Sequence, residues 1–251
     1  GFQTAFAFDI DIDAVKTFSN NISEHVQCLS VTDNEVSLRI SEAVKDRTFV
    51  LVGGPPCQGF SQQRRGDPID ERNNLVVEFA ELVSKLGHKP SAVVLENVTY
   101  LDSPRGRHIF EAYAARMEGL GYKLFRHDLN SADFGVAQLR RRIVSVAIKK
   151  EFSKRYLGPE KTSSDRWPTV GEVLSDLPSP SLSSSENSLP NHTPSREGPL
   201  NRRRISYVDM GMGRMAVPDV LQLKCHTKYG GHLDVYGRLD WFSQARTITG
   251  G

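Results

Sequence analysis

Cysteine is scarce in this chain, and its scarcity narrows the classes of protein to consider. The 251 residues contain three cysteines, Cys28, Cys57 and Cys225, an odd number with no closely spaced pair. This pattern indicates neither a disulfide framework nor a metal site built from cysteines. We therefore expect a protein of a reducing, intracellular compartment that binds no metal.

Long apolar runs and an excess of one charge are also missing. No run approaches the length of a membrane span, and the N-terminus lacks the basic and then apolar order of a signal peptide. The chain has 32 basic and 30 acidic residues, which leaves a net charge of +2. This balance neither indicates nor excludes a polyanionic partner. The expectation is a soluble protein with no membrane partner.

Strand-like and helix-like stretches alternate over residues 1–150. Strands are predicted over residues 4–10, 48–54, 91–97 and 142–148, and weaker helices over 35–46 and 106–119. The runs at 49–52 and 92–95 are continuously apolar, which is typical of parallel strands covered on both faces. Between them, apolar residues recur along one helical face from Leu75 to Leu86. The alternation predicts an α/β domain with a doubly wound, Rossmann-like parallel sheet.

The pattern changes after Lys150. Residues 177–199 are dominated by serine and proline, which predicts a loop or a poorly ordered connection. The stretch 200–240 then carries basic residues among glycines and short apolar pieces, namely Arg202, Arg203, Arg204, Arg214, Lys224 and Lys228. We expect a second, less regular lobe over residues 151–240, whose basic side chains in 200–228 suit a nucleic acid backbone.

The stretch VGGPPCQGFS, from Val52 to Ser61, places Cys57 directly after a predicted strand. Ligands of α/β sheets bind beyond the carboxyl ends of the strands, so Cys57 lies where chemistry is expected. The glycines allow a substrate to approach closely and the prolines restrict φ. A thiolate at this position is a candidate nucleophile. A buried structural cysteine is the alternative that the residues alone leave open.

Three more groups are candidates for chemistry. In an open parallel sheet an acidic residue that ends the second strand commonly binds ribose hydroxyls. Asp9 ends the first strand visible in this chain, so it has that role if the glycine-rich loop lies before residue 1. Glu96 ends a buried strand, where a carboxyl group can donate a hydrogen bond or a proton. Gln138, Arg140 and Arg142 share one face of an extended segment, and guanidinium groups suit phosphates or carboxylates. The plainer alternatives are a surface aspartate, a glutamate that caps a turn and a solvated basic turn.

Taken together, these stretches resemble the DNA (cytosine-5) methyltransferases. GGPPCQGFS is similar to the Pro-Cys-Gln loop of that family, ENV at 96–98 to its Glu-Asn-Val motif, and QLRRR at 138–142 to its Gln-x-Arg-x-Arg motif. Weaker similarities are found at 8–21, 70–75 and 236–251. The motifs follow the order of the family and extend over the whole chain, although thinly in 150–235.

The resemblance implies a mechanism on double-stranded DNA. Cys57 would add to C6 of a cytosine that has been flipped out of the duplex, and C5 would then accept the methyl group of S-adenosyl-L-methionine. Glu96 would contact the base at N3 and its exocyclic amine, Arg142 would hold the base edge, and Arg140 would support the pocket. The further substrate contacts implied are Pro56, Gln58, Ser61, Asn97 and Gln138.

The resemblance also assigns a cofactor site. Its residues would be Asp9, Ile10, Ser30, Gly54, Pro55 and Leu75. Asp9 would bind the ribose of S-adenosyl-L-methionine, and Ile10 would pack on its adenine. Ser30 stands where the family usually has an acidic residue that contacts the adenine amine, so the chain departs from the family pattern there.

The family begins with a glycine-rich cofactor loop and ends with an asparagine-bearing segment, and neither is found here. We therefore expect a fragment of a longer protein. Residues 1–150 would form an incomplete catalytic domain, 151–240 a target-recognition lobe, and 241–251 the start of the return to the catalytic domain. The expected parent is a monomeric enzyme of a bacterial restriction-modification system, in the cytoplasm or at the nucleoid. A tRNA cytosine-5 methyltransferase and a non-catalytic DNA-binding remnant remain as alternatives.

Overall fold

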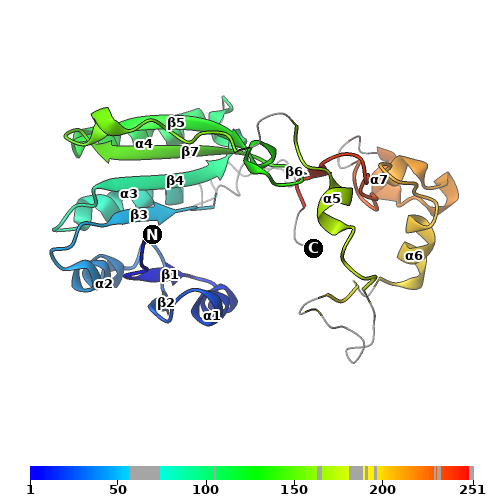
Figure 1. The fold of residues 1–251 in the computed structure, drawn as a ribbon, viewed down its shortest axis with the longest axis horizontal. Helices are drawn as coiled ribbons and strands as arrows, with labels where there is room; N and C mark the ends of the chain where they lie inside the picture. The colour runs from blue at the N-terminus through cyan, green and yellow to red at the C-terminus, as the bar shows by residue number, and fades with distance from the viewer. Residues whose placement is uncertain are drawn as a thin grey trace. The chain divides into compact units, whose positions relative to one another are not determined.

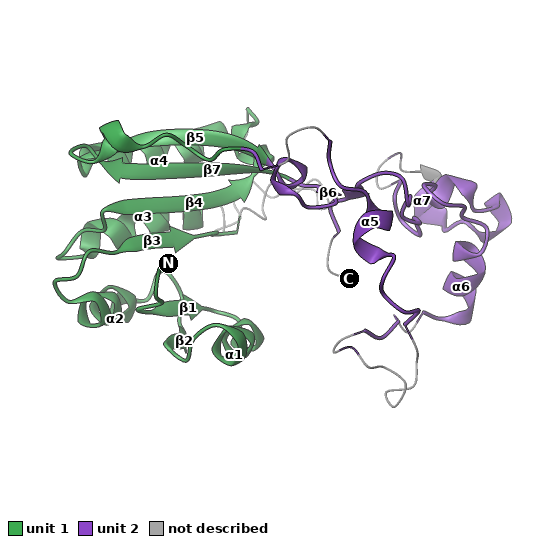
Figure 2. Ribbon diagram, viewed as in Figure 1, with its two compact units in different colours: residues 1–129, 141–160 green, residues 130–140, 161–251 purple. Residues whose placement is uncertain are grey.

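The chain is described by a computed structural model (Figure 1). It describes residues 1–56, 74–104, 106–162, 166–180, 189, 192–194, 197–228, 230 and 233–248. These form two compact units (Figure 2): unit 1 is residues 1–129 with 141–160, and unit 2 is residues 130–140 with 161–251. The predicted catalytic loop, with Cys57, Gln58 and Ser61, lies outside the described residues.

The main sheet of unit 1 has four strands in the order β3-β4-β7-β5. Their bounds are Val50–Gly53 for β3, Ala92–Val98 for β4, Tyr122–Asn130 for β5 and Arg141–Lys149 for β7. Three of them confirm strands predicted from apolar runs, and β5 was missed. β3 and β4 are parallel, but β7 runs antiparallel to β4. The α/β fold class predicted from the sequence is confirmed, and the predicted parallel sheet contains one antiparallel strand, β7.

The direction of β7 follows from how the chain reaches it. Backbone hydrogen bonds join Lys150 to Gly121 and Ser131 to Arg140, so β5 and β7 are antiparallel neighbours. A short connection suffices for such a pair, whereas a parallel pair needs a crossover of a dozen or more residues. Strand β7 consequently lies between β4 and β5, which run in the same direction.

Two helices cover the main sheet and build the larger core. They are α3 (Leu75–Lys85) and α4 (Arg107–Gly119), close to the predicted bounds. The buried side chains of α3 and α4 pack together with those of β4 and β7. The members of this core include Val76, Phe79, Val83, Val93, Leu95, Ile109, Tyr113, Met117, Ile143 and Ala147. Apolar periodicity explains both helices, because each turns one stripe toward the sheet.

A second, two-stranded sheet completes unit 1. Parallel strands β1 (Ala7–Asp9) and β2 (Val26–Cys28) are joined by α1 (Ile12–Asn21). Helix α2 (Asn34–Val44) links the two sheets, because its buried face contacts side chains from β1 and β3 as well as α3. The carboxyl ends of β1 and β2 are adjacent, as in the predicted cofactor site.

Unit 2 contains little regular structure. Its helices are α5 (Val170–Leu174), α6 (Pro199–Ile205) and α7 (Lys224–Lys228), with a short parallel pair of β6 (Gln138–Leu139) and β8 (Ala245–Arg246). Unit 2 also has single 3-10 turns at Ser131–Phe134, Arg214–Ala216 and Asp219–Leu221. Unit 1 has two such turns, at Thr99–Asp102 and Ser153–Arg155. The pairing of β6 with β8 explains why residues 130–140 cluster with this unit and not with the catalytic domain predicted for 1–150.

Candidate active site

The carboxyl end of β4 brings two predicted site residues together. The register pairs Val98 with Arg142, so the first residues of β7 lie beside the last residues of β4. Arg142 Nε lies 3.0 Å from Glu96 Oε1, and the two side chains are 20% and 45% exposed. The antiparallel direction of β7 is what makes this ion pair possible. In a parallel sheet Arg142 would lie at the opposite end of β4.

Asn97 joins Pro55, at the start of the predicted catalytic loop, to the same strand end. Its side chain is buried, its Nδ2 donates to the carbonyl of Pro55 at 3.0 Å, and its Oδ1 accepts from the N–H of Val98. A buried amide needs such partners, because an unsatisfied one is costly. Sequence reasoning missed this contact, although a polar residue in a buried run was a signal for it. The predicted contact of Asn97 with substrate stays a prediction.

The two glycines before the prolines have different surroundings. A Cβ added to Gly53 would lie 2.6 Å from the ring of Phe79, so glycine at this position lets α3 pack on the sheet. This packing contact explains why residue 53 is glycine, and the predicted close approach of a substrate there stays a prediction. A Cβ on Gly54 would instead lie 3.4 Å from Glu96 Oε2. Gly54 leaves that carboxylate oxygen uncovered on one side.

The predicted cofactor residues of the small sheet lie at one edge of it. Asp9 ends β1 and its Oδ1 accepts from the N–H of Asp11 at 2.9 Å, while Ile10 is exposed beside it. Ser30 follows β2 and its hydroxyl is hydrogen-bonded to that of Thr32 at 2.8 Å. The exposed carboxylate and the exposed apolar side chain suit ribose hydroxyls and an adenine face. Leu75, the first residue of α3, is half-buried.

Two predicted residues belong to unit 2. Gln138 is in β6, paired with Ala245 of β8, and Arg140 follows β6. The N–H of Arg140 donates to Asn130 Oδ1, which fixes the backbone before β7.

Between Arg140 and Arg142, Arg141 forms an exposed ion pair with Asp128. The side-chain roles predicted for Gln138, Arg140 and Pro56 stay predictions.

Two basic residues predicted to face nucleic acid are buried instead. Arg204 is 7% exposed, and its Nε donates to the carbonyl of Leu221. Arg214 is 2% exposed and donates to the carbonyl of His226. Both guanidinium groups serve the interior of unit 2, because its backbone carbonyls take up their donors. The expectation that all basic residues in 200–228 serve a nucleic acid is wrong for these two.

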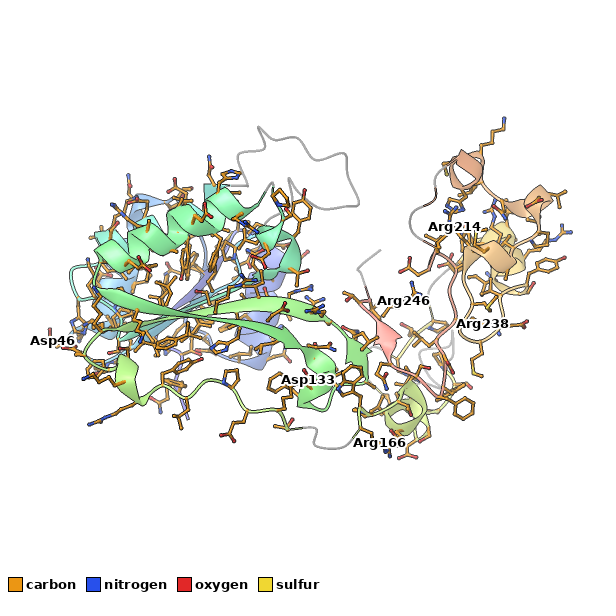
Figure 3. All side chains as sticks on the ribbon, turned by 90° about the horizontal axis from the view of Figure 1, so that it is seen from above. Asp46, Asp133, Arg166, Arg214, Arg238 and Arg246 are labelled. Atoms are coloured by element: carbon orange, nitrogen blue, oxygen red, sulfur yellow. The ribbon has the colours of Figure 1, made fainter. Side chains whose placement is uncertain are left out.

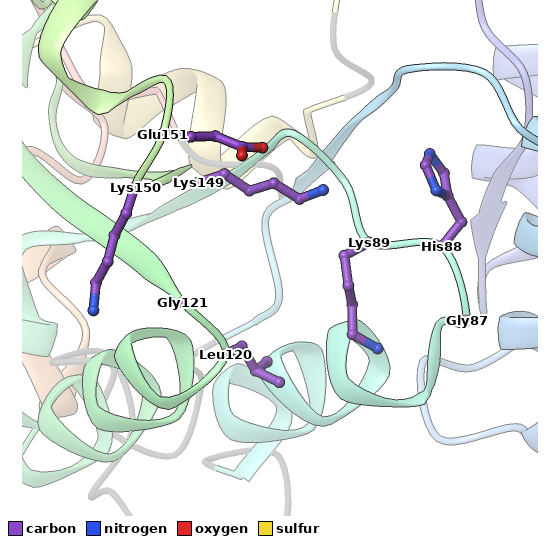
Figure 4. Close-up of a pocket in the computed structure, with 8 residues that line it drawn as sticks. All are labelled: Gly87, His88, Lys89, Leu120, Gly121, Lys149, Lys150 and Glu151. Carbon is purple, nitrogen blue, oxygen red and sulfur yellow. The ribbon is translucent and has the colours of Figure 1, made fainter.

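A cavity of about 590 Å³ lies away from these residues (Figure 4). The residues that line it precede β4, precede β5, or lie at and after the end of β7: Gly87, His88, Lys89, Leu120, Gly121, Lys149, Lys150 and Glu151. Burial lowers the pKa of Lys89, whose ammonium donates to the carbonyls of Ser84 in α3 and of Leu86 just after it. No predicted site residue lines this cavity, which is therefore distinct from the candidate active site.

Within the described residues, two further kinds of site are absent. None of the helices there is both long and apolar enough to cross a membrane. No three or more His, Cys, Asp and Glu side chains are grouped so that they could hold a metal ion.

The fold is of the α/β class, and comparison with known proteins identifies the family. Residues 1–207 match the sequence model of the C-5 cytosine-specific DNA methylase family. The chain belongs to this family. The match spans the Cys57 loop, the Glu96 strand end and the Arg142 strand, which are the three motifs read from the sequence.

Curated relatives are longer than this chain. Type II methyltransferase M1.HphI of Haemophilus parahaemolyticus is 31% identical over 230 residues, which are 88% of this chain and 59% of that protein. Type II methyltransferase M.NaeI of Lentzea aerocolonigenes is 33% identical over 177 residues, 70% of this chain and 41% of that protein. The chain thus spans about half the length of the curated relatives it matches.

Solved structures agree on the fold. A protein described as a DNA modification methyltransferase encoded within an E. coli prophage is 22% identical with a TM-score of 0.62, over 98% of this chain and 76% of that one. The S. pombe Dnmt2 methyltransferase is 14% identical with a TM-score of 0.52, over 83% of this chain and 59% of that one. At these identities the likeness concerns the fold alone.

Proposed function

We propose that this chain carries the catalytic part of a DNA (cytosine-5) methyltransferase of a bacterial restriction-modification system. The observation that supports this most directly is the Glu96–Arg142 ion pair beside the start of the Cys57 loop, in a chain of the C-5 methylase family. We further propose double-stranded DNA as the substrate and a monomer in the cytoplasm or at the nucleoid as the working form.

The half-exposed ion pair is better explained by positioning than by stability. Exposed or partly exposed pairs stabilise a fold by about 0–1 kcal/mol, because water screens them and two long side chains lose freedom. Here the pair holds one carboxylate oxygen, Oε1, while the other faces Gly54. Glu96 is thereby oriented to hydrogen-bond the N3 edge and the amine of a cytosine. Arg142 is oriented to hold the same base.

The chemistry assigned to Cys57 follows from the weakness of C5 as a nucleophile. The Cys57 thiolate forms a bond to C6 of the flipped-out base, and the electron pair of the C5–C6 bond becomes available at C5. S-adenosyl-L-methionine, when bound, supplies an electrophilic methyl group. After the C5 proton is lost to a base, the C5–C6 double bond reforms and the Cys57 thiolate leaves. Glu96 stabilises the charge that develops on the ring during the addition.

The residues assigned to the cofactor fit its chemistry. An exposed carboxylate at Asp9 can accept from ribose hydroxyls, and an exposed apolar side chain at Ile10 can cover an adenine face. Both lie at the carboxyl edge of a parallel strand pair, where ligands of α/β sheets bind. Asp9→Ala is expected to weaken S-adenosyl-L-methionine binding more than DNA binding, as titration calorimetry with each ligand will show.

The test uses DNA duplexes that carry 5-fluorocytosine, incubated with the chain and S-adenosyl-L-methionine. Fluorine at C5 cannot leave as a proton does, so a working Cys57 stays covalently attached and denaturing electrophoresis shows a shifted band. Cys57→Ser is expected to abolish the band, because a hydroxyl is a much weaker nucleophile than a thiolate.

The matched control is Cys225→Ser, an exposed cysteine of unit 2, which is expected to keep the band. A band that persists in Cys57→Ser contradicts the mechanism. Replacing the duplexes with tRNA that carries 5-fluorocytosine tests the RNA alternative in the same gel. A chain that binds duplexes but attaches to neither nucleic acid would be the non-catalytic remnant.

A further inference from the structure

Arg140 is the single residue between two strands that belong to different sheets. Strand β6 ends at Leu139 and pairs with β8, whereas β7 begins at Arg141 and its pairing with β4 begins at Arg142. Neither of these two pairings includes Arg140. Its main-chain N–H and carbonyl therefore take other partners, and those partners decide where its side chain starts.

Two consecutive residues, Asn130 and Ser131, hold both main-chain groups of Arg140. The N–H of Arg140 donates to Asn130 Oδ1 at 3.1 Å. Its carbonyl accepts from the N–H of Ser131 at 3.0 Å and from the Ser131 hydroxyl at 3.2 Å. The two side-chain bonds are partly buried, and a hydrogen bond away from bulk water is stronger than an exposed one. The peptide groups on both sides of Arg140 are therefore fixed.

The side chain of Asn130 takes the place of a main-chain acceptor. Facing residues of an antiparallel pair can exchange two N–H···O bonds, and the N–H of Ser131 makes the first of them to Arg140. The second would run from the N–H of Arg140 to the carbonyl of Ser131. That carbonyl accepts from the N–H of Val136 at 3.3 Å, and the N–H of Arg140 donates to the Asn130 amide oxygen. An apolar residue at position 130 could not accept this bond.

The turn that follows Asn130 has anchors of its own. Asp133, labelled in Figure 3, lies in the 3-10 turn Ser131–Phe134. Its carboxylate accepts from Trp167 Nε1 at 3.0 Å and forms an ion pair with Lys161 at 3.1 Å. A change at Asn130 leaves these contacts in place, so its first effect is to release the one N–H that its amide oxygen holds.

We infer that Asn130 is a positioning residue for the proposed methyl transfer, because it fixes the main chain of Arg140 and so orients the guanidinium group. The inference rests on the proposed function and on the pocket role that the family resemblance implies for Arg140. Arg142 is held by other contacts, since it pairs with Val98 in the sheet and with Glu96 through its Nε. Asn130 therefore acts through Arg140. A group that is slightly misplaced in a site slows the reaction more than it weakens binding.

The test measures how fast the chain attaches to duplexes that carry 5-fluorocytosine, in the presence of S-adenosyl-L-methionine and at increasing duplex concentration. Asn130→Leu keeps the size of the side chain and removes the acceptor. We expect the maximal rate to fall about tenfold, and the duplex concentration that gives half of it to change by less than about twofold. Asn130→Asp keeps an oxygen acceptor and should restore the maximal rate to within about twofold of the unchanged chain.

A double-mutant cycle separates positioning from a general loss of structure. Arg140→Ala removes the guanidinium and should itself slow attachment. In that background Asn130→Leu should slow it by less than about twofold more, because no guanidinium remains to be oriented. A variant that merely loosened the fold would slow both backgrounds alike. Urea titration of each variant gives its folded fraction, so the rates are compared per folded molecule.

Asp128→Asn is the matched control. It breaks the exposed ion pair with Arg141 two residues before Asn130, and the rate of attachment should not change. An unchanged maximal rate in Asn130→Leu, equal slowing in the two backgrounds, or an Asn130→Asp variant as slow as Asn130→Leu overturns the inference. No attachment by the unchanged chain refutes the proposed function, and the inference falls with it. The two failures are thus distinguished by the unchanged chain.

Discussion

The two units differ in what fills their interiors. Unit 1 buries leucine, isoleucine, valine and aromatic side chains between its main sheet and helices α3 and α4. Among the described residues of unit 2, the buried apolar side chains are Ala132, Ala137, Val170, Val208, Val217 and Ala245, joined by Arg204 and Arg214. Hydrophobic burial therefore dominates the stability of unit 1, whereas unit 2 relies more on hydrogen bonds from buried guanidinium groups.

Arg204 shows how unit 2 accommodates a charge in its interior. Its Nε donates to the carbonyl of Leu221 at 2.7 Å, its Nη1 donates to Asn201 Oδ1 at 2.8 Å, and its guanidinium lies 5.7 Å from the centre of the Tyr236 ring. Burying a charge is costly unless it is hydrogen-bonded in this way. The comparison teaches that a small, loop-rich unit can replace apolar volume with a few multiply bonded arginines. Its apolar side chains then remain available at the surface.

The largest effect is expected from a cavity in unit 1. Leu95→Ala removes a side chain that is 1% exposed on β4, and the free energy of unfolding of unit 1 should fall by about 3 kcal/mol. Urea titration followed by far-UV circular dichroism measures it, with exposed Val52→Ala on β3 as the control. Both tryptophans, Trp167 and Trp241, belong to unit 2. If their fluorescence transition moves equally, the two units unfold together and the comparison fails.

The matching change in unit 2 is Arg214→Met. It removes a charge-assisted hydrogen bond and leaves the carbonyl of His226 without that donor, which should cost about 2 kcal/mol. Tryptophan fluorescence during urea unfolding reports it. Arg238→Met alters an exposed arginine that is hydrogen-bonded through its backbone, so it should change the midpoint little. Equal effects of both variants would show that the buried arginine is no more important than a surface one.

Two buried tyrosines sharpen the comparison within unit 1. Tyr122 donates to the carbonyl of Pro90 at 2.7 Å, and burial raises the pKa of its hydroxyl to about 12. Tyr122→Phe should therefore lower the free energy of unfolding by about 1 kcal/mol.

Neither Tyr113 Oη nor Ser145 Oγ makes a well-formed hydrogen bond among the described residues. Tyr113→Phe should change stability by less than about 0.5 kcal/mol, and a larger loss in thermal unfolding would contradict this reading.

The smallest effect concerns pH and unit 2. Burial lowers the pKa of His226, and the nearby Arg214 and Arg204 lower it further. The unfolded chain therefore binds the proton more readily, so unit 2 should lose stability as pH falls through about 6.5 toward the folded pKa. Fluorescence-detected urea midpoints at pH 8 and pH 5.5 measure this loss. His226→Gln should remove most of the difference, and an unchanged difference would assign it to other groups.

Much of unit 1 could be predicted because its signals are local. The apolar face from Leu75 to Leu86 placed α3 almost to the residue, and continuous apolar runs placed β3 and β4. The direction of β7 could not be predicted, since parallel and antiparallel strands that are buried on both faces have the same apolar pattern. The Glu96–Arg142 contact depends on that direction and on a register that spans 46 residues of chain. The order of the motifs alone suggested that Glu96 and Arg142 belong to one site.

Unit 2 was less predictable for a physical reason. Arginine is usually exposed, so the run Arg202–Arg204 gave no sign that its last member is buried. The partners of Arg204, at Leu221 and Tyr236, are distant in sequence and follow no period. The close contact of Gly213 with the carbonyl oxygen of Leu233 was likewise missed. Such backbone contacts between loops leave no pattern in composition.

The pairing of β6 with β8 has a consequence for how such proteins diversify. Unit 2 is assembled from residues 130–140 and 161–251, with a stretch of unit 1 between them in the sequence. A genetic crossover near residue 160 would replace the larger segment but retain the resident β6. The two strands are joined through main-chain groups, such as the N–H of Ala245 and the carbonyl of Ala137 at 2.9 Å. Because most side chains are compatible with a main-chain ladder, a foreign β8 can dock on the old β6. One recombination event can therefore replace residues 161–251 and retain unit 1 together with β6.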